Sequence, residues 1–288
     1  MNQGKTKPFL EYEYQLKIMM DRGLSVSNPD EAIEILKRTN YYRLSAYSLT
    51  LRKDDLFYED VTFENIYELY CFDAGLRETL LRYCFIVEIS FRSYISHFFS
   101  FKYGALGYMD SAHFENETRH ESFLSDLSKE IRRSDDVFIE HHKTNRNSIF
   151  PFWVAIEETT YGMLSKFFKN MLKDDRNEFA HLFIGYSRQY VENWIQCCSF
   201  CRNIAAHGGR FYNRDLRSCP VKLSPKVHKG VKNTSPFAYI IAISNLLPND
   251  HYRSSFISEI KALFQKHPFA LKKHLGFPDR DWEQMLLP

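Results

Sequence analysis

The stretch from Thr62 to Gly104 decides the fold of this chain and reads TFENIYELYCFDAGLRETLLRYCFIVEISFRSYISHFFSFKYG. Apolar residues recur along it at helical spacing and form one broad face, made of Ile66, Leu69, Leu76, Leu80, Val87, Phe91, Ile95 and Phe98. Thr62 can cap the first turn, and Gly104 is a stop signal. We therefore predict a helix of about 40 residues, which is long for a globular protein, with a kink at Gly75.

Shorter segments with the same spacing flank this helix on both sides. We expect further helices before Gly23, from Pro29 onward, and over residues 121–133, 151–172, 187–207, 236–247 and 251–267. Residues 51–61 lack a helical period and predict a loop or small hairpin, and residues 211–235 predict a loop. The pattern indicates an all-α bundle with an N-terminal helical extension. We divide the chain into an extension (1–60), a helical core (61–247) and a C-terminal helical tail (248–288).

The composition is that of an ordinary globular protein. Of the 288 residues, 44% are hydrophobic and 26% are charged, and the net charge of +2 points to no partner for the chain as a whole. No apolar run reaches the roughly 18 residues of a membrane span, and the polar N-terminus lacks the apolar core of a signal peptide. We expect a cytoplasmic protein that binds no membrane.

Six cysteines are scattered without the regular spacing of a disulfide framework. Cys198 and Cys201 have the spacing of a zinc-ligand pair, but no second pair follows at finger-like spacing. Cysteines crowded on one predicted helix more often pack in a core, so we expect no metal and no cofactor. His141-His142 is interpreted as a polar loop pair. Three aromatic residues of the N-terminal extension are interpreted as core, namely Tyr41, Tyr42 and Tyr47.

Polar side chains gather at the end of the helix predicted over 187–207, where the sequence reads Arg-Asn-Ile-Ala-Ala-His-Gly-Gly from position 202. Asn203 and His207 are four residues apart and therefore neighbours on a helix. Arg202 lies about 140° around the helix from His207, but its long side chain can curl back, and a second subunit could bring another such pair close. His207 is also at the helix C-terminus, where the dipole favours an imidazolium.

These residue types suit RNA cleavage by internal transesterification, in which the ribose 2′-OH attacks the adjacent phosphorus and the 5′-oxygen leaves. The reaction needs a group that moves protons and a cation that holds the phosphate oxygens. Histidine performs the first task near neutral pH, and the planar guanidinium of arginine performs the second. No metal is required.

Positive charge is concentrated after this motif. Residues 202–232 hold eight Lys or Arg and one acid, Asp215, and so carry a net charge of +7. Such a patch would bind phosphates in a salt-dependent and largely sequence-independent way, and Phe211 and Tyr212 could stack on bases. The alternative is a set of solvated lysines without a ligand. The candidate RNA contacts here are Arg210, Asn213, Arg214, Lys222 and Lys226.

The spacing Arg-Asn-x-x-x-His is that of the HEPN motif (higher eukaryotes and prokaryotes nucleotide-binding), and the run that continues to Arg214 resembles the abortive-infection (Abi) proteins of bacterial phage defence. Three further blocks agree with that family in the right order. They are Asn40–Tyr47, the Glu-x-x-x-Arg of Glu88 and Arg92, and Pro151–Ser165. The resemblance covers about residues 8–215.

This resemblance implies a HEPN-like bundle that dimerises so that two motifs face one cleft. It also implies a metal-independent endoribonuclease toxin, acting on RNA and not DNA, and sometimes restrained by a small structured RNA. Arg202 and His207 take the catalytic positions, Asn203 the supporting one, and Arg210 and Asn213 match trailing positions of unassigned role. Where many relatives carry a second histidine this chain has glycines, which leaves one histidine per motif.

Several alternatives stay open on the sequence alone. Glu88 and Arg92 form either a salt bridge on a helix surface or a buried pair that orients Arg202. Arg202 and His207 could be a solvated helix end. The chain could also be a non-catalytic RNA-binding or scaffold protein of a defence or toxin–antitoxin system. A metal-dependent nuclease or nucleotidyltransferase is disfavoured, because no spaced acidic triad or phosphate-binding loop is present.

Overall fold

The structure is a computed structural model that describes residues 8–287. Within these residues, 66% of positions are helical when the short 3₁₀ and π turns are included, and twelve α-helices accompany one two-stranded sheet. The all-α prediction is confirmed. In the described residues, no helix is long and apolar enough to cross a membrane.

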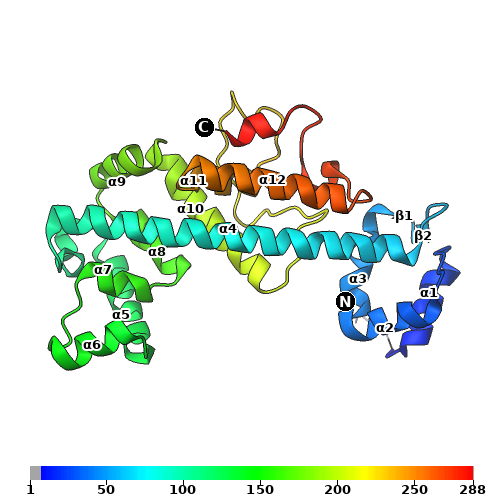
Figure 1. Cartoon of the computed structure of the whole chain (residues 1–288), viewed down its shortest axis with the longest axis horizontal. Helices are drawn as coiled ribbons and strands as arrows, with labels where there is room; N and C mark the ends of the chain where they lie inside the picture. Colours follow the sequence, from blue (N-terminus) through cyan, green and yellow to red (C-terminus); the bar gives the residue numbers. More distant parts are fainter. Residues whose placement is uncertain (1–7, 288) are drawn as a thin grey trace, which may run out of the picture.

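One long helix, α4 (Phe63–Tyr103), runs through the molecule, and the other helices lie along it (Figure 1). Thr62 and Asn65 form a capping box at its start, and Gly104 ends it with φ 77°. Its 41 residues give a rod of about 61 Å. Figure 1 shows α11 and α12 on one side of this rod and α5 to α8 on the other, near its C-terminal half.

The kink predicted at Gly75 is wrong, because α4 is helical without interruption across this position. Gly75 instead lies under α12 (Asp250–Lys266). A Cβ atom at Gly75 would lie 2.7 Å from Cδ1 of Leu263. The glycine therefore permits a close approach of two helices rather than a change of direction.

The N-terminal segment forms three helices and a hairpin, as predicted for residues 51–61. Pro29 opens the second helix, and the side chain of Asn28 caps it by accepting from the N–H of Glu31. The hairpin turns through two aspartates with positive φ, Asp54 and Asp55. The elements are α1 (Tyr12–Asp21), α2 (Pro29–Thr39), α3 (Tyr41–Ser45), β1 (Arg52–Lys53) and β2 (Leu56–Phe57), with the two strands antiparallel.

The middle of the chain differs from the prediction of one helix over 151–172. Thr159 interrupts it by hydrogen bonding to the carbonyl of Ile156, and Thr160 then caps a new helix through the N–H of Met163. His141-His142 lies within a helix, so its assignment to a loop was wrong. The helices are α5 (Glu117–Arg133), α6 (Val137–Asn145), α7 (Phe152–Ala155), α8 (Tyr161–Asn170) and α9 (Lys173–Phe179). The helix predicted over 121–133 thus begins four residues earlier, and α9 was not predicted.

The C-terminal part agrees with the predicted pattern of helix, loop and two helices. Residues 207–235 form the loop between α10 (Arg188–Ala206) and α11 (Pro236–Leu246), and α12 follows. Every residue of α11 is buried, because it packs against both α10 and α4. Short 3₁₀ or π turns complete the described chain at Ser48–Thr50, Gly107–Met109, Ser111–His113, Ile156–Glu158, Ala180–Ile184, Lys272–Leu275 and Glu283–Leu286.

The hydrophobic core is one cluster that extends from Leu16 to Leu286. It therefore includes residues from all three segments of the proposed division, whose boundaries fall just before α4 and between α11 and α12. Whether these segments are separate units stays a prediction. Of the N-terminal aromatic residues, Tyr47 is in the core, whereas Tyr42 is 66% exposed and was wrongly placed there.

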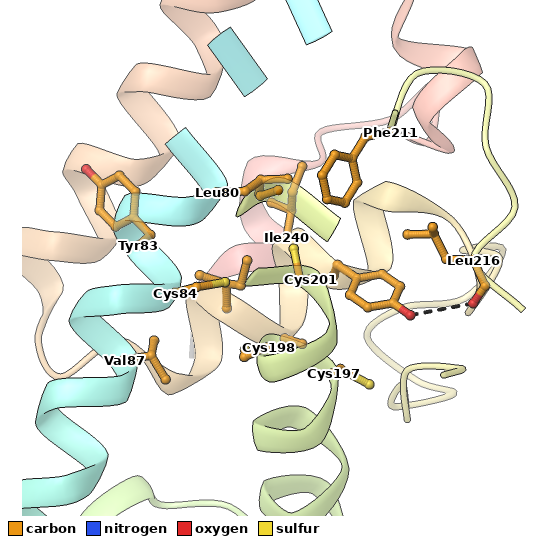
Figure 2. Packing of buried hydrophobic residues seen from close by; sticks show 14 of the residues in the cluster. Leu80, Tyr83, Cys84, Val87, Cys197, Cys198, Cys201, Phe211, Leu216 and Ile240 are labelled. Atoms are coloured by element: carbon orange, nitrogen blue, oxygen red, sulfur yellow. Dashed lines mark hydrogen bonds between the residues drawn. The ribbon is translucent and has the colours of Figure 1, made fainter. Parts of the chain in front are cut away.

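The crowded cysteines of α10 pack in the core, two against α4 and one against the loop that follows α10. Cys84 of α4 faces Cys198 and Cys201 of α10 (Figure 2). Cys197 Sγ lies 3.4 Å from Cys219 Sγ, and all five of these thiols are buried. Burial raises the pKa of the Cys198 thiol well above its ordinary value. The core-packing interpretation is confirmed, and within residues 8–287 no cluster of three metal-ligating side chains occurs.

Candidate active site

The motif occupies the exposed C-terminal end of α10. Arg202 and Asn203 lie in its last turns, and His207 is the C-cap residue, whose backbone N–H donates to the carbonyl of Asn203 at 3.1 Å. Asn203 and His207 are exposed, and Arg202 is half-buried. The guanidinium of Arg202 donates to Oδ1 of Asn203 at 3.2 Å. Arg202 and Asn203 are therefore in contact, and His207 follows one turn later at the same accessible end of the helix.

Two glycines end the helix and place His207. Gly208 has φ 66°, a conformation that a side chain disfavours. A Cβ atom at Gly209 would lie 2.7 Å from the side chain of Ile204. The backbone N–H of Gly209 donates to the carbonyl of Ile204 at 2.8 Å. The two glycines that follow His207 thus have a backbone role in this chain.

Glu88 and Arg92 of α4 form a buried ion pair beside this end of α10. Their N–O distance is 2.5 Å, with side-chain exposures of 3% and 12%. Arg92 also donates to the carbonyl of Thr159 at 2.7 Å, in the break between α7 and α8. The surface salt bridge considered from the sequence is therefore wrong.

Arg202 lies close enough to Glu88 to influence its ionisation. Burial raises the pKa of Glu88, and the positive charges of Arg92 and Arg202 oppose that rise. Oε2 of Glu88 is buried without a hydrogen-bond partner among the described residues. A role of Glu88 in orienting Arg202 stays a prediction, since the interaction seen here is between charges and not a hydrogen bond.

Asp73 anchors the chain just after the motif, and sequence reasoning missed it. Its fully buried carboxylate accepts the backbone N–H groups of Phe211 and Tyr212 at 3.0 and 2.7 Å. It also accepts from the hydroxyl of Tyr47 at 2.7 Å and from Arg77 at 2.6 Å. Burial raises the pKa of Asp73, whereas these hydrogen bonds and the charge of Arg77 act in the opposite direction. The available signal was a carboxylate within the apolar face of the predicted long helix.

Arg43 is a second residue that sequence reasoning did not single out. It lies in α3, within the block Asn40–Tyr47, and is exposed. Its guanidinium donates to the carbonyl of Gly208 at 2.6 Å, immediately after His207. The N-terminal and C-terminal blocks of the resemblance therefore meet in space, and Arg43 adds a cation next to the motif.

The trailing residues Arg210, Asn213 and Arg214 mostly organise the backbone after the motif. Arg210 donates to the carbonyls of Tyr212 and Asn213 at 2.5 and 3.1 Å, and burial lowers its pKa. Arg214 donates to the carbonyl of Arg210, and Asn213 has φ 50°. Their contact with RNA stays a prediction. The suggestion that Phe211 and Tyr212 stack on bases is wrong, because both are buried.

The basic loop places its lysines on the outside of the molecule. Lys222 reaches back to α10, where Nζ donates to Oε1 of Gln189 at 2.6 Å and lies 5.7 Å from the ring centre of Tyr190. Lys226 is exposed. The one acid of the loop, Asp215, pairs with Arg217 and Lys232, which together with a hydrogen bond from Thr234 lower its pKa.

Comparison with known proteins bears on the same residues. A family model described as Abi-like protein matches residues 34–213. The chain belongs to this family. The match includes the block around Arg43, the pair Glu88 and Arg92, and the motif up to Asn213, whereas Lys222 and Lys226 lie beyond it. No curated protein and no solved structure matches significantly. Family membership suggests a role in abortive-infection phage defence.

Proposed function

We propose that this Abi-like protein is a metal-independent endoribonuclease of the HEPN type that acts as a toxin in abortive infection. The observation that carries the proposal is the exposed end of α10. It carries Arg202, which is hydrogen bonded to Asn203, and His207 one turn after Asn203. A buried ion pair and the Asp73 and Arg43 contacts hold the surrounding backbone. A rigid scaffold under an exposed polar cluster is typical of catalytic sites.

In the proposed reaction, the 2′-oxygen of a ribose forms a bond to the adjacent phosphorus while the bond from phosphorus to the 5′-oxygen breaks. His207 moves a proton, either from the attacking 2′-OH or to the leaving 5′-oxygen. Arg202 holds the non-bridging oxygens, on which negative charge grows in the transition state. The products are a 2′,3′-cyclic phosphate and a 5′-hydroxyl end. This chemistry needs neither a metal nor a cofactor.

A homodimer completes this scheme. Each chain supplies one histidine to the motif, whereas the reaction needs one proton removed and one delivered. Two copies with facing motifs supply both imidazoles. The apolar residues Phe85 and Ile89 support a contact here, because they are 52% and 49% exposed and flank Glu88 on α4. Restraint of the toxin by a small structured RNA is part of the proposal and rests on the resemblance alone.

A non-catalytic RNA-binding or scaffold role is the second candidate, and one observation favours it. The imidazole of His207 is exposed at a helix end, and within residues 8–287 no side chain hydrogen bonds to it to fix its orientation. A catalytic histidine is usually held by such a partner. In a dimer the missing partner would come from the second copy.

The decisive experiment incubates the purified protein with labelled single-stranded RNA in EDTA and maps the new ends. We expect cyclic-phosphate ends, and a loss of at least ~100-fold in rate for Arg202→Ala and for His207→Ala. Arg146→Ala and His141→Ala serve as matched controls, because they remove an exposed arginine just after α6 and an exposed histidine within it. Cleavage that survives both motif substitutions, or that requires added magnesium, contradicts the proposal. Binding without new ends supports the second candidate.

A further inference from the structure

A groove between α8 and α10 leads away from the motif and is lined by several lysine, amide and hydroxyl side chains. It consists of two adjoining hollows of about 320 and 310 Å³. The first is lined by Asn203, Gln196, Lys166 and Lys169 among others, and the second by Lys169, Gln196, Gln189 and Lys222 among others. Lys169 and Gln196 line both, so the hollows adjoin and together extend from Asn203 of the motif to Lys222 of the basic loop.

The same face of α10 carries both the floor of this groove and the catalytic histidine. Four residues of α10 lie at spacings of seven, seven and four, which keeps them on one side of the helix. They are Gln189, Gln196, Asn203 and His207. Arg202 lies about 100° around the helix from Asn203 and about 140° from His207, on the side of Glu88. Fourteen residues separate Gln189 from Asn203, so the path is about 21 Å long, or about six nucleotides at the ~3.4 Å spacing of a stacked strand.

The groove is positively charged although the whole chain is nearly neutral. Lys166, Lys169 and Lys222 are exposed along it. Its one acidic lining residue, Glu192, is neutralised by two arginines, with Oε1 at 2.5 Å from Arg176 and 2.8 Å from Arg188. The hydrogen bond to Gln189 holds Lys222 against the groove instead of leaving it free in solvent. The local charge therefore favours a polyanion.

We propose that this groove binds the single-stranded RNA that leads into the active site, with Lys166, Lys169 and Lys222 contacting successive phosphates. This inference rests on the proposed function and extends it to residues outside the motif. Amide and hydroxyl side chains between the lysines suit ribose and base edges. The half-buried ring of Phe200 offers a surface for base stacking.

The test measures binding, so that it does not depend on cleavage. A labelled single strand of about 12 nucleotides is titrated with His207→Ala protein, and its fluorescence anisotropy gives Kd at several salt concentrations. Adding Lys166→Ala, Lys169→Ala and Lys222→Ala together is expected to weaken binding roughly 10- to 100-fold and to reduce the slope of log Kd against log salt by about 2. The matched control removes three exposed lysines elsewhere, Lys17, Lys53 and Lys273.

A variant with an added positive charge serves as a second test, because weaker binding in the triple variant could also result from misfolding. Gln196 is exposed between the groove lysines, and Gln196→Lys is expected to tighten binding several-fold. If the triple variant has an unchanged Kd and salt slope, the proposal that RNA binds in the groove is wrong. Tighter binding to duplex than to single strand would also contradict it. If the groove variants behave as expected but wild-type protein yields no new RNA ends, the groove stands and the ribonuclease proposal fails.

Discussion

Asp73 Oδ1 accepts a hydrogen bond from the backbone N–H of Tyr212 at 2.7 Å, across 139 positions of sequence. The same carboxylate binds the N–H of Phe211, and both contacts are buried. The long helix α4 thereby fixes the chain as it leaves α10 at the end that carries His207. The position of the motif depends on a charge that lies in the core and never meets substrate.

Removal of the Asp73 carboxylate is expected to destabilise the fold strongly. Asp73→Ala leaves two buried N–H groups and the charge of Arg77 without a partner, at a cost of about 3–5 kcal/mol in the free energy of unfolding. Asp73→Asn keeps an oxygen that can accept the backbone N–H groups, so it should cost less. Urea unfolding measures both, with the exposed Asp54→Ala as control. Equal stability of Asp73→Ala and wild type would contradict the anchoring role.

Arg43→Ala is expected to reduce catalysis more than stability. Arg43 is exposed, so its loss should change the free energy of unfolding by less than about 1 kcal/mol. It nevertheless fixes the carbonyl of Gly208 beside His207. We expect kcat to fall about 10-fold, or about 1.4 kcal/mol in the barrier, with partial rescue by Arg43→Lys. Steady-state cleavage kinetics test this. A change in stability without a change in kcat would make Arg43 purely structural.

Helical spacing was sufficient to predict most of the fold. The apolar face of α4 and its capping Thr62 lie close together in sequence, and the structure has the helix where they indicate. The role of Gly75 could not be predicted in the same way, because the glycine makes room for Leu263 of another helix. At the break between α7 and α8, the local contacts of Thr159 and Thr160 are joined by a distant one, because Arg92 donates to the carbonyl of Thr159. Local pattern predicted helices, and tertiary contact decided their interruptions.

The candidate site was only partly visible for the same reason. The placement of Arg202, Asn203 and His207 follows from spacing on one helix. The contacts of Asp73 and Arg43 join segments 138 and 165 residues apart, and no local signal pairs them. The burial of Tyr212 could not be predicted from the sequence either, since an aromatic residue in a basic loop suits either base stacking or core packing.

Stability should respond to pH through Glu88. Because burial raises its pKa above the ordinary value of 4.5, the folded chain binds a proton at higher pH than the unfolded chain. This contribution to stability is therefore full below about pH 4.5, and it is lost as the pH rises through the folded-state pKa. We expect the free energy of unfolding of wild type, relative to Glu88→Gln, to increase as the pH falls from 7 toward 4. Urea unfolding across this range measures it.

The control for this pH series is Glu78→Gln, since Glu78 is an exposed glutamate of the same helix. The difference in free energy of unfolding between wild type and Glu78→Gln should stay constant from pH 7 to pH 4. If the free energy of unfolding of wild type relative to Glu88→Gln decreases toward low pH, the pairing with Arg92 outweighs burial and the pKa of Glu88 is lowered.

The proposed dimer predicts that charge on the exposed apolar pair of α4 abolishes assembly and cleavage together. Phe85→Asp and Ile89→Asp alter half-exposed side chains, so the fold should tolerate them better than core substitutions. Light scattering should show a wild-type dimer and a monomeric double variant, with a loss of cleavage comparable to that of His207→Ala. Phe101→Asp, on the same helix at 88% exposure, should leave both unchanged. A wild-type monomer that cleaves RNA would show that one imidazole suffices, and that His207 both accepts and returns the proton within a single chain.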